Sequence, residues 1–126
     1  MIFLDTNILL EITLSNRLHY TQVQRFLQTT KEETAISILT CHLVIHFGRK
    51  EKAEEAFLHA VLNENKLIAL TSSDYKWATD NEHGKDFEDA LQLSSAIRSG
   101  CSSFVTLDAA LAKRYTKLPI RIVVPN

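Results

Sequence analysis

Three aspartates stand where an α/β chain would place catalytic carboxylates. Asp5 follows the apolar segment 2–4, Asp108 follows the apolar segment 103–106, and Asp89 lies near the start of an amphipathic segment. Like charges gathered in a dry cleft cannot all stay ionised unless a cation neutralises them. Oxygen ligands of this kind suit Mg²⁺ or Mn²⁺, which retain several water molecules. The chemistry expected is hydrolysis of a phosphodiester by a metal-activated water.

The elements that must position these acids alternate between short apolar runs and amphipathic stretches. This alternation predicts an α/β fold with a parallel sheet and helices on both of its faces. The predicted strands cover residues 1–4, 35–37, 66–70, 103–106 and 120–124. The predicted helices cover residues 7–14, 19–30, 39–47 (ending near Gly48), 50–62, 72–80, 86–98 and 109–115. The helix over 50–62 is expected to bury an apolar stripe made of Ala53, Ala56, Phe57, Ala60 and Val61.

The three aspartates are expected to converge at one edge of this sheet. Ligands bind beyond the carboxyl ends of the strands in open α/β sheets, and Asp5 and Asp108 both follow strands. The helix that begins near Asp86 returns to the sheet through Gly100, so its first turn, with Asp89, lies at the same edge. Each acid also has a structural alternative. Asp5, Asp86 and Asp108 can cap the helices that follow them, and Asp89 occupies the capping-box position after Asp86.

Three short motifs give the chain its resemblance to a known family. They are Ile2-Phe3-Leu4-Asp5-Thr6-Asn7, then Phe87-Glu88-Asp89-Ala90-Leu91 with Ala96, and finally Phe104-Val105-Thr106-Leu107-Asp108. In this order and at these separations they resemble the motifs of the PIN-domain ribonucleases, including the VapC-type toxins of toxin–antitoxin pairs. The likeness extends from residue 1 to about 124, so one PIN-like domain over residues 1–126 is expected.

The resemblance implies a three-layer α/β/α sandwich with a five-stranded parallel sheet and cleavage of RNA with Mg²⁺ or Mn²⁺. By position, Asp5, Asp89 and Asp108 would be the catalytic metal ligands. Thr6 or Thr106 would orient these carboxylates and Asn7 would shape the pocket, although turn and cap hydrogen bonds are the alternative for all three. The resemblance also implies a homodimer and inhibition by a cognate antitoxin protein.

One departure from the family pattern bears on activity. The second family motif places a glutamate on the helix after the second strand, and here His42 is expected at that position, with no acid between Glu33 and Glu51. Neutral imidazole is a poor ligand for Mg²⁺, so two alternatives stay open. The chain is either a nuclease with altered metal preference or rate, or a degenerate domain that binds RNA or protein without catalysis. Two further features could compensate: His46 lies four residues after His42 on the same helix face, and Glu11 follows the first motif.

Composition limits the partners of the chain. Its 126 residues suit one domain, and the net charge of −1 lacks the basic excess typical of nucleic-acid binders. Local cations would then have to meet RNA phosphates, with Lys113 and Arg114 as candidates, although basic residues at a helix end also complement its dipole. The absence of a signal-peptide pattern and of a long apolar stretch predicts a cytoplasmic protein without a membrane span. Cys41 and Cys101 are expected to be reduced.

Overall fold

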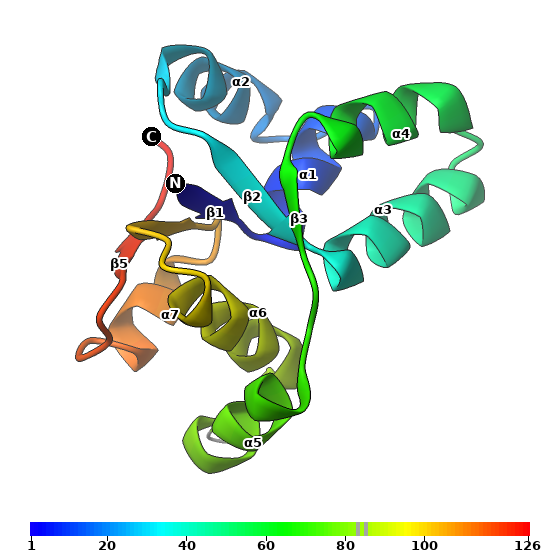
Figure 1. Ribbon diagram of the computed structural model, residues 1–126. Coiled ribbons are helices and arrows are strands. Elements are labelled where there is room, and N and C mark those ends of the chain that lie inside the picture. Colours follow the sequence, from blue (N-terminus) through cyan, green and yellow to red (C-terminus); the bar gives the residue numbers. More distant parts are fainter. Residues whose placement is uncertain (83, 85) are drawn as a thin grey trace.

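The structure is a computed structural model that describes residues 1–82, 84 and 86–126. Its five strands are β1 (Ile2–Leu4), β2 (Thr34–Ser37), β3 (Lys66–Ile68), β4 (Ser103–Val105) and β5 (Arg121–Val123). The helices of the described residues are α1 (Thr6–Thr13), α2 (Tyr20–Thr29), α3 (Ile38–Lys50), α4 (Glu55–Asn63), α5 (Ser72–Asn81), α6 (Phe87–Arg98) and α7 (Ala109–Arg114). The strands form one parallel sheet in the order β3-β2-β1-β4-β5 (Figure 1). The predicted five-stranded parallel α/β fold is therefore confirmed.

The apolar strand residues separate into two cores because successive side chains of a strand point to opposite faces. In β1, Leu4 belongs to the core on one face, whereas Phe3 belongs to the core on the other. β4 follows the same rule, with Val105 on the first face and Phe104 on the second. Phe3 and Phe104 are paired in register and stack with ring centroids 5.4 Å apart. Both faces are therefore buried, as is typical of parallel sheets.

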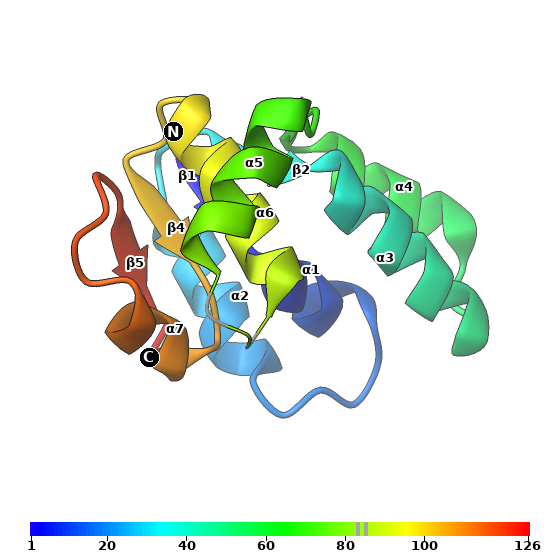
Figure 2. The same cartoon turned by 90° about the horizontal axis from the view of Figure 1, so that it is seen from below.

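The helices form the two outer layers of the sandwich. Side chains of α1 to α4 belong to the core on the first face, and side chains of α6 and α7 belong to the core on the second. The helices accordingly lie on both sides of the sheet (Figure 1). Helix α5 packs against α6 on the outside of that second layer (Figure 2). The buried carboxylate of Asp74 on α5 accepts a hydrogen bond from Arg98 Nη2 of α6 at 3.0 Å, which ties these two helices together.

The order of the strands creates one topological switch point. The chain proceeds from β1 outward to β2 and β3, then returns to the other side of β1 to form β4 and β5. The connections therefore leave β1 and β4 toward opposite faces of the sheet, and a crevice opens beyond their carboxyl ends. Gly100, with a φ of 76°, turns the chain from the end of α6 toward β4. This path brings the first turn of α6 to the same crevice.

The boundary between α3 and α4 differs from the sequence prediction. Helix α3 continues through Gly48 to Lys50, and the chain turns at Lys52, whose φ is 58°, before α4 begins at Glu55. Gly48 is not a helix end but a point of close packing, because a β-carbon at this position would overlap the side chain of Leu58. The predicted single helix over 50–62 is therefore wrong.

The buried face of α4 also differs from the predicted stripe. Leu58 and Leu62 are buried in the first core, whereas Phe57 is 47% exposed. Ala56 and Ala60 are exposed as well. Ala53 and Val61 do pack against the first core, so the buried face of α4 passes through Leu58, Val61 and Leu62 and not through Phe57. The other predicted elements agree with the structure to within about two residues, apart from a slightly longer α3. No helix of the described residues is long and apolar enough to span a membrane.

The contact between Gly48 and Leu58 generates a stability prediction. Gly48→Ala should lower the free energy of unfolding by about 1–3 kcal/mol because the added methyl group overpacks the α3–α4 contact. In an exposed helix the same change would stabilise by about 1 kcal/mol. Urea denaturation of the purified variant measures the effect. In a double-mutant cycle with Leu58→Ala, the combined loss should be smaller than the sum of the single losses. An increase in stability for Gly48→Ala alone would contradict the packing described here.

Candidate active site

Asp5 occupies the centre of the crevice because β1 ends directly before it. Its backbone N–H donates to Val105 O of β4 at 2.9 Å, which continues the strand pairing by one residue. One carboxylate oxygen, Oδ1, caps α1 by accepting from Thr6 N at 2.7 Å. The other, Oδ2, accepts from Thr106 Oγ1 at 2.8 Å and from Asn7 Nδ2 at 3.2 Å. Asp5 thus caps a helix and also presents a fixed carboxylate at the crevice.

Asn7 links the two strand ends on either side of the switch point. Its amide nitrogen also donates to Thr106 Oγ1 at 3.1 Å, and its amide oxygen accepts from Leu107 N at 3.1 Å. The loop after β4 is therefore fastened to the start of α1. Asn7 and Thr106 hold the Asp5 carboxylate through their side chains, whereas Thr6 contacts it only through its backbone N–H.

The side chain of Thr6 belongs instead to a buried polar network that joins three helices. Thr6 Oγ1 lies 2.8 Å from Thr40 Oγ1 of α3 and accepts from Gln92 Nε2 of α6 at 2.9 Å. Thr40 Oγ1 in turn lies 3.2 Å from Gln92 Oε1. Thr40 and Gln92 are fully buried, and sequence analysis did not single them out. Their signal was faint: Thr40 sits three residues after Ser37, which caps α3.

The N-terminus of α6 brings three more acids to the crevice. Asp86 caps this helix, because its Oδ1 accepts from Glu88 N at 3.0 Å and Asp89 N at 3.4 Å. Asp89 is buried, Glu88 is half-buried and Asp86 is exposed. Asp5, Glu88 and Asp89 therefore face one cavity of about 270 Å³, which is also lined by Thr6, Asn7, Leu10, Leu43, Phe47 and Asp86.

Arg114 connects Asp89 to Asp108 across the other side of the site. Its Nη2 lies 3.3 Å from Asp89 Oδ2 and 3.6 Å from Asp108 Oδ2. Asp108 caps α7 with its other oxygen, which accepts from Ala110 N at 3.0 Å. Arg114 therefore turns toward the acids, whereas Lys113 beside it is exposed. Asp108 and Asp89 are joined through this guanidinium.

The electrostatics of the site follow from burial and from the proximity of like charges. Burial raises the pKa of Asp5 to about 6, against the hydrogen bonds from Thr106 and Thr6 that favour its ionised form. Burial raises the pKa of Asp89 to about 7, with added repulsion from Asp5, Asp86 and Asp108 and partial compensation by Arg114. The pKa of Glu88 is raised too, first by burial. The cluster therefore holds more negative charge than its own cations neutralise.

The side chains at the crevice are of the kind that hard divalent cations prefer, although they do not surround one point. All the acidic ligands are carboxylates, which Mg²⁺ and Mn²⁺ prefer. Among the residues that the structure describes, no three histidine, cysteine or acidic side chains are grouped around one point in a way that would hold an ion. Mg²⁺ is usually bound by one or two carboxylates with several waters, so the set suffices for a partly hydrated ion.

The helix α3 contributes no acid to the cavity. Its residues that line the cavity are Leu43 and Phe47. His42 is exposed and does not line the cavity. Its ring stacks with that of His46 at a centroid distance of 6.0 Å. Glu11 does not turn toward the cavity either. It is buried and accepts a hydrogen bond from His19 N at 3.1 Å, which fastens the loop before α2.

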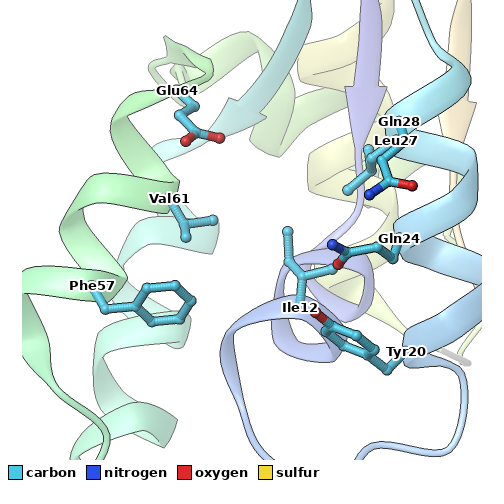
Figure 3. A pocket seen from close by; sticks show the side chains of 8 residues that line it. All are labelled: Ile12, Tyr20, Gln24, Leu27, Gln28, Phe57, Val61 and Glu64. Atoms are coloured by element: carbon cyan, nitrogen blue, oxygen red, sulfur yellow. The ribbon is translucent and has the colours of Figure 1, made fainter.

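A second hollow lies between α2 and α4, away from the aspartates (Figure 3). The side chains of Ile12, Leu27, Phe57 and Val61 give it an apolar lining, and Tyr20 stands at its edge. Its lining includes a single acidic residue, Glu64. This groove offers mainly apolar contacts, whereas the cavity around Asp5 offers carboxylates.

A comparison with known protein families identifies the family of the chain. The model of the PIN domain matches residues 2–117. The chain belongs to the PIN domain family. Residues 5, 89 and 108 all lie within the matched segment. No protein of curated function matches the sequence significantly.

Solved structures similar to this PIN domain include three from bacterial toxin systems. A toxin–antitoxin complex from Klebsiella pneumoniae is 21% identical with a TM-score of 0.78, covering 100% of this chain and 98% of that one. VapC20 of Mycobacterium tuberculosis, described as a sarcin–ricin loop cleaving toxin, is 12% identical with a TM-score of 0.76, covering 96% and 99%. VapBC2 of Rickettsia felis, bound to a promoter DNA fragment, is 19% identical with a TM-score of 0.73, covering both chains completely. At these identities the likeness shows the shared fold.

The raised pKa of Asp89 predicts a pH-dependent cost in this PIN domain. The pKa of this carboxyl group rises from 3.8 to about 7 on folding. Its contribution to the free energy of unfolding is therefore fully present below pH 3.8 and is lost as the pH rises through 7. Asp89→Asn should therefore raise the melting temperature of the metal-free protein more at pH 8 than at pH 4. Thermal unfolding at both values measures this difference. Asp80→Asn, at an exposed position of α5, is the control. An equal effect of Asp89→Asn at the two pH values would refute the prediction.

Proposed function

We propose that this PIN domain is a divalent-metal-dependent ribonuclease that hydrolyses RNA phosphodiesters and acts as the toxin of a toxin–antitoxin pair. One observation carries the proposal: Asp5 and Asp89, both with raised pKa values, meet at the β1/β4 switch point of a PIN-family chain, with Asp108 joined to them through Arg114. Buried carboxylates that repel one another favour a bound cation.

Asp5, Asp89 and Asp108 would hold Mg²⁺ or Mn²⁺. The ion would lower the pKa of a bound water and stabilise the charge that develops on the phosphodiester. The chain itself supplies orientation, because Thr106, Asn7 and the Thr6 backbone fix both oxygens of Asp5. Fixed carboxylates reduce the reorganisation needed when the substrate reacts.

The partners follow from the same proposal. RNA is the substrate, and the similar toxin–antitoxin complex favours an antitoxin protein as the inhibitory partner. A homodimer belongs to the proposal through the family resemblance alone. A second candidate function is an RNA- or protein-binding module without catalysis. It is favoured by α3, which offers Leu43 and Phe47 to the cavity instead of an acid.

Substitution of the central aspartate tests the catalytic proposal. Asp5→Asn should reduce cleavage of a labelled single-stranded RNA by about 100-fold or more, because it removes charge from the cation site and keeps the side-chain volume. Cleavage is measured with Mg²⁺, with Mn²⁺ and after chelation. Asp80→Asn serves as the matched control. Full activity of Asp5→Asn would refute the proposed site, and RNA binding without cleavage by the native protein would support the non-catalytic alternative.

The basic side chains of α7 generate a separate expectation for RNA binding. Lys113→Ala should weaken RNA binding and lower the slope of log affinity against log salt by about 0.7, the value for one lost contact to a single-strand phosphate. Lys113 is exposed near the end of α7, one residue before the guanidinium that meets the acids. Fluorescence anisotropy at several salt concentrations gives the slope. The exposed Lys31 provides the control as Lys31→Ala. An unchanged slope for Lys113→Ala would remove this residue from the interface.

A further inference from the structure

Glu88 stands at the cavity opposite the wall that α3 leaves without an acid. That wall consists of Leu43 and Phe47, and Glu88 projects toward the same cavity from the first turn of α6. A half-buried glutamate in a cavity that already holds Asp5 and Asp89 adds repulsion unless a cation neutralises these charges. Glu88 is therefore a candidate for the acid that α3 does not contribute.

The contacts of Glu88 hold it at the cavity. Its Oε1 accepts from Gln92 Nε2 at 3.0 Å. The same Gln92 nitrogen donates to Thr6 Oγ1 at 2.9 Å, and Thr6 N caps the carboxylate of Asp5. Glu88 is therefore fixed by the buried network that also fixes the neighbour of Asp5. A glutamate that only complemented the helix dipole would need none of these partners.

Burial and hydrogen bonding distinguish Glu88 from Asp86, the other additional acid. Glu88 is half-buried in the lining of the cavity and accepts a hydrogen bond from the buried Gln92. Asp86 is exposed, and its Oδ1 is engaged by two backbone N–H groups of α6. Glu88 accepts from a side chain, that of Gln92, so its carboxylate is not engaged in capping α6.

We propose that Glu88 is a ligand of the divalent cation and supplies from α6 the carboxylate that α3 does not provide. This inference rests on the proposed function, because it adds a ligand to the same metal site. It also gives the site a further oxygen donor, whereas α3 offers only carbon to the cavity. Glu88 would then bind the ion from the same cavity as Asp5 and Asp89, and these carboxylates would have to close around it, because among the described residues they are not grouped around one point.

Metal binding to the intact protein tests this assignment apart from activity. Calorimetric titration of the metal-free protein with Mn²⁺ should show binding weakened by about tenfold or more in Glu88→Gln. Glutamine keeps an oxygen that can accept from Gln92, so the network should persist. Glu54→Gln, at an exposed position before α4, is the matched control and should bind as the native protein does. Native-like Mn²⁺ affinity of Glu88→Gln would overturn the proposal.

A charge-relocation variant makes the test independent of Glu88→Gln alone. In Leu43→Glu/Glu88→Gln the acid moves to the α3 wall of the same cavity, and Mn²⁺ affinity should recover at least in part. A purely structural Glu88 would give no such recovery. If Glu88→Gln unfolds, Glu88→Asp takes its place. A shorter carboxylate should still bind Mn²⁺, more weakly than the native protein, and unchanged affinity would again count against the proposal.

The outcomes also separate this inference from the proposed function. If Asp5→Asn abolishes Mn²⁺ binding and Glu88→Gln does not affect it, the metal site stands and Glu88 is not a ligand. If the native protein neither binds Mn²⁺ nor cleaves RNA, the proposed function fails, and the inference about Glu88 fails with it.

Discussion

The burial of carboxylates at the end of β1 is the constraint on which the site of this PIN domain depends. Asp5 and Asp89 are buried, and their pKa values are raised to about 6 and about 7 because burial penalises the charge of each. Such a cluster costs folding free energy, which the two apolar cores must outweigh. The parallel sheet tolerates it only at the crevice beyond its strand ends, where solvent and cations have access.

Hydrogen bonds keep these charges in place. Asp5 is held through both oxygens, by Thr6 N on one side and by Thr106 and Asn7 on the other. The network of Thr6, Thr40 and Gln92 then joins α1, α3 and α6 beneath the cavity. Every described buried polar side-chain atom has a hydrogen-bond partner, so the side chains that hold the site are fixed in place. Rigid support is what a metal site or a reacting phosphodiester requires.

Helix capping leaves each of these aspartates with an oxygen for a second role. Asp5 and Asp108 each cap a helix with one oxygen and present the other to the site. A carboxylate has two oxygens, so the cap does not exclude a second partner. The alternatives drawn from the sequence were therefore not exclusive, and the cap accounts for the fixed orientation of each group.

The sequence alone determined the five-stranded parallel sheet, and it predicted that Asp5, Asp89 and Asp108 gather at one of its edges. These features depend on local patterns: continuous apolar runs, amphipathic helices, and acids that closely follow strands. The order of the strands was not predicted and comes from the structure. Tertiary packing decided the rest. His42 and Leu43 differ by about 100° around α3, and only the packing of that helix on α1 selects which of them lines the cavity. Gly48 likewise lies inside α3, where it packs closely against Leu58. The direction of α7 brings Arg114 into contact with Asp89 and Asp108. Contacts between segments far apart in the chain set the phase of a helix and the direction of a long side chain, and a local sequence pattern does not encode these contacts.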